Sequence, residues 1–355
     1  MSLSGYVLRA VGTRVAAATI MLLAVLQILD LLEVTPEIVE RGLGFAGVMH
    51  YAVLRLPRLI DQAAPLGVLA GSIFAFMKLA GDSEIVAMRA SGVSVYRLLG
   101  MALPVALMAS LLDFSAVEIV APRTDPMLQS WWQSTAPSAK TPETEAKPKA
   151  FRVGADLALA STNDLSGRTL SDVKIYRRDA TGRETERIEA AGATYGPQGW
   201  RLIAPKFVRF DAAGAHVGQA AQMTWGSRFE PADVQALFFG DQNLSAASAS
   251  RALRGGGGQR PQSYYATRVQ RAIAAPIGSL VMLLLTVPIA VASFRSSKGA
   301  VFVAASLGAG LLFIVVDGLL AALGEGGALA PVLAAWTAPV VFAALGATAL
   351  LRLEG

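Results

Sequence analysis

The stretch AIAAPIGSLVMLLLTVPIAVASF, residues 272–294, contains no charged side chain. An α-helix crosses the hydrocarbon core of a bilayer with about 20 apolar residues, so this stretch predicts a membrane span. A second uncharged stretch follows at residues 326–351. Four other apolar segments predict further spans, at residues 15–32, 62–77 with its flanks, 98–121 and 299–323. With 54% apolar residues and a mean hydropathy of +0.49, the chain is predicted to be an integral membrane protein.

A polar block separates the six predicted spans into two groups of three. We therefore expect an α-helical membrane protein with six transmembrane helices and an inserted β domain. The first predicted domain, residues 1–122, holds three spans and a short helix near residues 82–92. The β domain follows at residues 123–262, and the last three spans occupy residues 263–355.

The polar block has the pattern of β structure. Val173 and Ile175 alternate with polar neighbours, as in a half-buried strand. Turn signals separate the strands, which are expected at residues 172–178, 186–195, 200–210 and 216–225. Short strands at this spacing favour a sandwich or a jelly roll. The edges of the block, residues 135–149 and 245–261, have linker-like compositions and are expected to be flexible.

Basic residues beside the short connections predict the orientation, because Lys and Arg are retained in the cytoplasm. They place both termini in the cytoplasm and the polar block outside. The residues that carry this signal are Arg9, Arg14, Lys78, Arg89, Arg97, Arg295, Lys298 and Arg352. Arg41, Arg55 and Arg58 fall on the other side and weaken the bias without reversing it. The first apolar segment lacks a small-residue cleavage site and is expected to be a retained anchor.

The net charge of +5 does not predict a nucleic-acid partner, because no basic stripe is interleaved with aromatic residues. The chain has no cysteine, so the outer domain is expected to fold without disulfides. Its two histidines, His50 and His216, do not form a recognisable metal-binding set. Because no catalytic or nucleotide-binding motif occurs, we expect neither an enzyme nor a cofactor in this chain.

The segment between the second and third spans predicts a short cytoplasmic helix. Asp82 and Ser83 supply side-chain oxygens that favour a helix start, and Gly92 is a plausible terminator. Ile85 and Met88 fall on one face of this helix. Glu84 and Arg89 are poorly placed to pair with each other, so both charges are expected to be available to a partner. The alternative is a solvated connector at the membrane surface.

The run Gly81-Asp-Ser-Glu-Ile-Val-Ala-Met-Arg-Ala-Ser-Gly-Val-Ser94 resembles the coupling-helix signature of the LptF/LptG permeases of the lipopolysaccharide export ABC transporter. The resemblance covers nearly the whole chain. Similar residues elsewhere are Leu56-Pro57, Pro65, Gly71, Glu118-Ile-Val-Ala-Pro122, Val287-Pro288 and Asp317. The acidic end of the first span and residues 167–176 look more like LptG than LptF.

The resemblance implies a multi-pass protein of the bacterial inner membrane with a periplasmic β-jellyroll. It implies as partners an LptF-like permease, an LptB-like ATPase dimer that binds ATP and Mg, an LptC-like membrane protein and a periplasmic LptA-like bridge. Lipopolysaccharide would be extracted from the outer leaflet of the inner membrane and passed to this bridge. Coupling to the ATPase would involve Glu84, Ile85, Met88 and Arg89, with an Arg on the ATPase as the partner of Glu84.

Candidate substrate-binding residues follow from the same resemblance. Family members place several lysines at the outer end of the first span, but only Arg41 is basic between Gln27 and Tyr51 here. Apolar alternation predicts that Val173, Ile175 and Leu202 face inward in the β domain, either toward a path for acyl chains or into a closed structural core, which would give the same sequence pattern. Acids near the outer ends of the spans are expected to be structural or interfacial, since an acid binds an anionic lipid only through a cation. These acids are Asp30, Asp113, Glu118 and Asp317.

Two other functional classes stay open from the residues alone. One is the membrane subunit of another lipid or lipoprotein ABC system, and the other is a membrane-anchored periplasmic scaffold. A scaffold would not need the segment around Glu84. Small residues inside the spans permit close helix approach at a mobile interface or in static packing; they are Gly278, Ser279, Ala292, Gly308 and Gly310.

Overall fold

The computed structural model describes residues 2–135, 148–164, 166–179, 181–211, 214–225, 228–239, 244–286, 289 and 298–354. The chain forms two compact units. A helical unit comprises Met1–Ala121 and Gln270–Gly355, and a sheet unit comprises Pro122–Val269. The two predicted domain boundaries lie after residues 122 and 262, and the two units meet after residues 121 and 269.

The helical unit begins with two long antiparallel helices, α1 (Leu3–Glu40) and α2 (Gly44–Gly81), of 38 residues each. At 1.5 Å per residue each is about 57 Å long, so both exceed the roughly 30 Å thickness of a hydrocarbon core. The connection between them uses Gly42 and Gly44, which have φ angles of 72° and 58°. Such angles suit glycine, which has no Cβ to clash with the backbone.

A short helix, α3 (Glu84–Ala90), leads into α4 (Val95–Ser115). The five-residue π-helix η1 (Ala116–Val120) then joins α4 to α5 (Ala121–Ser134) without a break. Pro122 lies just after the π turn and has no backbone N–H, so the i→i−4 hydrogen bond to Glu118 cannot form there. The missing donor gives a physical reason for the local widening of the helix.

The C-terminal part of the chain contains α8 (Gln262–Leu284), α10 (Lys298–Glu325) and α11 (Pro331–Glu354). Five helices in the described part of the chain are long and apolar enough to cross a membrane. The span predicted at residues 272–294 starts within α8, but residues 287–288 and 290–297 lie outside the described residues. Six spans are therefore not confirmed.

The start of the last predicted span was wrong. We expected it at residue 326, but α11 begins at Pro331. Gly327 has a φ of 81°, which ends the preceding helix in a left-handed turn. Proline is favoured in the first turn of a helix because the N–H that it lacks has no intrahelical partner there.

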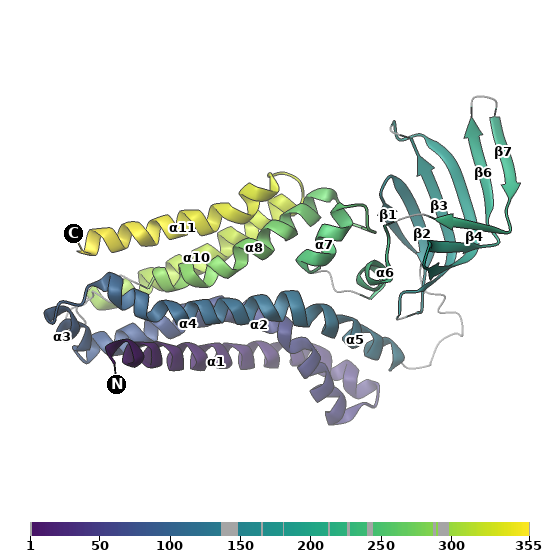
Figure 1. Ribbon diagram of the computed structural model, residues 1–355. Helices are drawn as coiled ribbons and strands as arrows, with labels where there is room; N and C mark the ends of the chain where they lie inside the picture. Colours follow the sequence, from purple (N-terminus) through teal and green to yellow (C-terminus); the bar gives the residue numbers. More distant parts are fainter. Residues whose placement is uncertain are drawn as a thin grey trace. The chain divides into compact units, whose positions relative to one another are not determined.

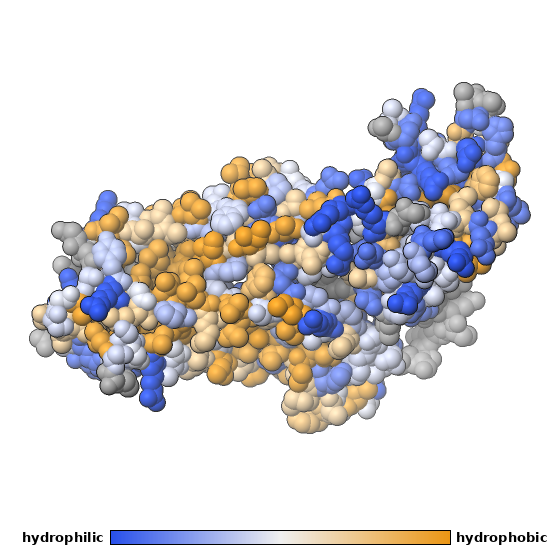
Figure 2. Space-filling model, viewed as in Figure 1, coloured by the Kyte–Doolittle hydropathy of each residue, from blue (hydrophilic) through white to orange (hydrophobic). Residues whose placement is uncertain are grey.

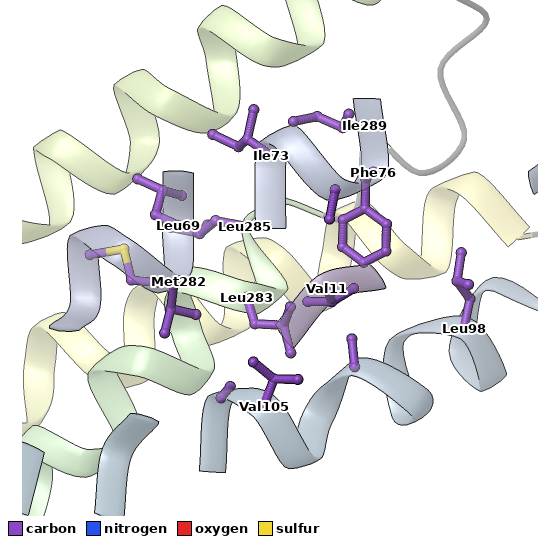
Figure 3. Close-up of a cluster of buried hydrophobic side chains, with 14 of the residues drawn as sticks. Val11, Leu69, Ile73, Phe76, Leu98, Val105, Met282, Leu283, Leu285 and Ile289 are labelled. Carbon is purple, nitrogen blue, oxygen red and sulfur yellow. The ribbon is translucent and has the colours of Figure 1, made fainter. Parts of the chain in front are cut away.

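The core of the helical unit draws on helices from both ends of the chain. Figure 3 shows side chains of this cluster from four helices, with Val11 on α1, Phe76 on α2, Val105 on α4 and Met282 on α8. The outer surface is also apolar: Met21 is 71% exposed and Val315 is 65% exposed. Figure 2 shows hydrophobic residues gathered over the surface of these helices. A surface of this kind fits a lipid environment.

The described residues of the sheet unit form eight strands in one antiparallel sheet (Figure 1). The strands are β1 (Lys149–Val153), β2 (Asp156–Ser161), β3 (Thr169–Arg178), β4 (Glu184–Gly196), β5 (Gly199–Ile203), β6 (Lys206–Asp211), β7 (Gly214–Gln219) and β8 (Gln222–Trp225). β4 pairs with the continuous strand β3 on one side and with both β5 and β6 on the other. The described strands form a meander, and the predicted jelly roll is not confirmed.

The prediction of single strands at residues 200–210 and 216–225 was wrong in detail. Ala204 has a φ of 50° and Pro205 has no N–H to donate, so the ladder is interrupted between β5 and β6. β5 and β6 nevertheless pair with β4 in one continuous register, because no residue is inserted or deleted between them. The backbone N–H of Ala220 donates to the Pro205 carbonyl, at 3.2 Å, where β7 gives way to β8.

The sheet is curved around an aromatic core. Trp225 of β8 donates its indole N–H to Asp156 of β2 at 3.2 Å, although several strands separate the two in the sheet. Phe229 and the helix α6 (Pro231–Phe238) cover the inner face. Phe151, Trp200 and Phe229 are almost completely buried there. Large aromatic rings of this kind contribute strongly to the energetics of a core.

The segment predicted to be flexible at residues 245–261 contains a helix, α7 (Ala246–Leu253). The Ser245 hydroxyl accepts a hydrogen bond from the Ser248 N–H at 3.3 Å and caps this helix. Further on, Gly258 and Arg152 exchange two backbone hydrogen bonds and cover the edge of β1. Most of the other predicted flexible edge, residues 136–147, lies outside the described residues.

Candidate functional site

The helix α3 starts from a strained turn rather than a side-chain cap. Ser83 lies in the left-handed region with a φ of 61°, and its hydroxyl does not cap the helix. The Asp82 carboxylate instead pairs with Lys78, at 2.9 Å. The prediction that these two side chains start the helix was therefore wrong, because the Asp82 carboxylate is paired with Lys78 and Ser83 has a left-handed conformation.

The end of α3 agrees with the predicted terminator. Gly92 has a φ of 85°, and the N–H of Val93 returns to the carbonyl of Met88 at 3.0 Å. This is the hydrogen-bond pattern of a glycine C-cap. Two residues later the Ser94 hydroxyl caps α4 by accepting from the Arg97 N–H at 3.2 Å. Defined ends on both sides fix the position of a helix that is too short to be stable alone.

The two faces of α3 have different surroundings. Ile85 and Met88 share the inner face, as predicted, and both are buried in the core of the helical unit. They anchor the helix, so a partner would meet the other face. That face consists of Val86, which is 66% exposed, together with the exposed residues Ala87, Arg89 and Ala90. A small apolar patch beside one cation is suited to a shallow protein groove.

Glu84 has a partner within the chain that sequence reasoning missed. The Tyr6 hydroxyl of α1 donates a hydrogen bond to Glu84 Oε1 at 2.9 Å. The two residues are separated by 78 positions, so no local pattern signals the contact. A carboxylate can accept several hydrogen bonds, so this contact leaves capacity for a cationic partner. It also places the start of α1 and the start of α3 at the same end of the helical unit.

The acids predicted to be interfacial have different environments. Asp30 of α1 accepts from Arg55 of α2 at 3.3 Å, and Asp317 of α10 accepts from Arg271 of α8 at 2.7 Å. Glu118 lies in η1. The candidate phosphate ligand Arg41 pairs with Glu37 one turn earlier in the chain.

A cavity of about 440 Å³ lies within the helical unit, between residues of α1, α2, α4, α8, α10 and α11. Most of its lining is apolar, and its charged residues are Asp61, Asp113, Arg271 and Asp317. The sequence singled out Asp113 and Asp317 as interfacial acids but did not predict that they share a cavity with Asp61 and Arg271. These residues come from four helices, and only the fold brings them together.

The sheet-unit candidates Val173, Ile175 and Leu202 all face inward and are at most 1% exposed. Val173 and Ile175 lie on β3 and Leu202 lies on β5. They share one core with Phe229 and Val234 of the covering segment. A lipid could reach them only if this covering segment moved.

A family model for the lipopolysaccharide export system permease LptF/LptG matches residues 5–352. The chain belongs to this family. Members are components of a transport system, so the chain is a lipopolysaccharide export permease in general, in agreement with the predicted family. A search of curated proteins found no match. Together with the spans, membership supports a multi-pass protein of the inner membrane.

Proposed function

We propose that the chain extracts lipopolysaccharide from the outer leaflet of the inner membrane and passes it to a periplasmic bridge, driven by a separate ATPase. The observation that carries the proposal is the family match at residues 5–352, on a chain with an inserted sheet unit and a helical unit whose outer surface is apolar. Withdrawing one acyl chain of ~12 carbons costs on the order of 10 kcal/mol, at about 0.8 kcal/mol per CH₂. The process therefore needs an energy source.

The outer face of α3 is the proposed contact with an LptB-like ATPase dimer, which binds the ATP and Mg. Arg89 and Val86 are exposed on this face, and Glu84 lies at its start. The Tyr6–Glu84 hydrogen bond supports a shared side of the membrane for the N-terminus and α3. We place this side, and the C-terminus, in the cytoplasm, with the sheet unit in the periplasm.

The proposed complex contains a second, LptF-like permease and an LptC-like membrane protein, and this chain takes the LptG position. The strand β7 offers a docking edge for an LptA-like bridge, because β6 is its only partner among the described strands. Its residues include no Lys or Pro, the usual features that prevent an edge strand from pairing with another chain. Strand addition would extend the sheet through backbone hydrogen bonds.

The inner face of the sheet unit is the proposed path for acyl chains. Photo-crosslinking amino acids at Val173, Ile175 and Leu202 should capture lipopolysaccharide during ATP-driven export, several-fold more than the same group at Glu189. The control position lies on the exposed face of β4, opposite Lys174 of β3. Capture is read by the mobility shift of the chain on a gel probed for lipopolysaccharide.

The same experiment separates a lipid path from a docking role. If no inward position captures lipid while the complex stays folded and active, the inner face is a closed core. The sheet unit would then serve only to dock the bridge through an edge such as β7.

A further inference from the structure

The charged residues of the cavity in the helical unit are not balanced. Asp317 is neutralised by Arg271, with 2.7 Å between Nη2 and Oδ2. Asp61 and Asp113 line the same cavity, and among the described residues of its lining only Arg271 is basic. Three carboxylates therefore share a cavity with one guanidinium.

Among the charged residues that line this cavity, Asp113 is buried without a partner for one of its oxygens. Its side chain is 4% exposed, and its Oδ1 atom is buried without a hydrogen-bond partner in the structure. Removing a carboxylate from water without pairing it is costly, and the cost is higher inside a membrane protein. An acid buried in this way within a membrane protein points to a functional site.

The lining of the cavity restricts the chemistry of that ligand. A phosphate is repelled by the excess of carboxylates. A bound metal ion needs several ligands, and the described residues contain no cluster of three acidic or histidine side chains that could hold one. Leu26, Leu66 and Phe313 provide apolar walls beside the acids. A cation with an apolar attachment fits both parts of the lining.

We propose that this cavity binds a primary ammonium group carried on a lipid head group, with Asp113 as its main acceptor and Asp61 beside it. An ammonium has three N–H donors and can bridge two carboxylates. A volume of about 440 Å³ accommodates an amine-bearing head-group fragment. The inference rests on the proposed function, since a lipid-handling permease presents such groups, and it specifies a substrate feature: a lipid with a free amine binds better than one without.

The test measures binding rather than transport. The complex containing the full chain is placed in nanodiscs and irradiated with a diazirine-bearing dodecylamine or with the matched dodecanol. Labelled residues are mapped by mass spectrometry. Wild type should be labelled at cavity residues such as Phe313 about tenfold more by the amine, corresponding to about 1.4 kcal/mol. Asp113→Asn should reduce amine labelling to the level of the alcohol.

Asp30→Asn is the matched control, because Asp30 does not line this cavity and pairs with Arg55 instead. Its labelling should equal that of wild type. Asp61→Asn provides a second variant should Asp113→Asn fail to fold, and it should lower amine labelling at least threefold. Equal labelling of wild type by amine and alcohol would overturn the proposal and indicate a protonated, neutral Asp113.

Two further outcomes are decisive. The preferential labelling by the amine should persist when the large organic cation of the buffer is replaced by sodium at equal ionic strength. Loss of the preference in sodium would indicate a metal-ion site and contradict the proposal. Lipopolysaccharide release is measured in parallel on the same preparations. If wild type releases lipopolysaccharide but shows no preference for the amine, only this inference is contradicted. If wild type releases no lipopolysaccharide, the proposed function is contradicted instead.

Discussion

Replacement of Gly71 by alanine is expected to force α1 and α2 apart and to destabilise the helical unit by about 3 kcal/mol. A Cβ at this position would lie 2.3 Å from Val15 Cα and 2.6 Å from Val15 N. These are backbone atoms, which cannot rotate away as a side chain can. Gly67 packs against α1 in the same way, because a Cβ added at Gly67 would lie 2.8 Å from the Cα of Thr19. The two glycines are four residues apart, the spacing that lets membrane helices pack closely.

The measurement is the melting temperature of the detergent-solubilised complex, followed by size-exclusion chromatography after heating. Gly100→Ala is the matched control, because this glycine is also within a helix and a Cβ there would meet nothing within 4 Å. It should be neutral or slightly stabilising, since alanine has a higher helix propensity than glycine. Equal melting temperatures for the Gly71 and Gly100 variants would show that the close packing of α1 on α2 is not important for stability.

Replacement of Glu84 by alanine is expected to uncouple ATP hydrolysis from lipid release or to weaken association with the ATPase, with the fold intact. The carboxylate is proposed to meet an Arg of the ATPase, and loss of one member of a buried charged pair costs roughly 2 to 5 kcal/mol at an interface. Complex assembly, ATPase rate and lipopolysaccharide release are measured on the same preparation. Arg89→Ala should have a smaller effect, because its long side chain can also reach lipid head groups.

Tyr6→Phe is the control that separates the two roles of Glu84. It removes the hydrogen bond at 2.9 Å and keeps the carboxylate. If the carboxylate acts on the ATPase, Tyr6→Phe should retain most of the coupling that Glu84→Ala loses. Equal losses in both variants would instead assign Glu84 a positioning role within the chain. Wild-type assembly, hydrolysis and release in Glu84→Ala would make α3 an ordinary interfacial connector.

Local patterns predicted the features that depend on local chemistry. The alternation around Val173 and Ile175 correctly placed both residues on a buried face, because a strand exposes its two faces in turn. Gly92 was correctly predicted to end α3, since its left-handed conformation excludes most other residues. The segments at residues 15–32 and 62–77 lie within spanning helices, although those helices extend well past them.

Features that depend on distant residues could not be predicted. The Tyr6–Glu84 and Arg271–Asp317 contacts join residues separated by 78 and 46 positions. The close approach at Gly71 depends on which helix lies beside it. At Ser83 a left-handed conformation replaces the expected cap, because the path of the chain between α2 and α3 outweighs the capping preference. The shared cavity around Asp113 likewise follows from the packing of six helices.

The central claim is that this chain is a permease that uses the ATP hydrolysis of a partner to extract lipopolysaccharide. The most direct measurement is lipopolysaccharide transfer from proteoliposomes to a soluble periplasmic acceptor, with and without ATP. We predict ATP-dependent transfer only when this chain, its partner permease and the ATPase are all present, and no hydrolysis by the purified chain alone. Equal transfer from proteoliposomes that lack this chain, or robust hydrolysis by the chain free of any contaminating ATPase, would contradict the account.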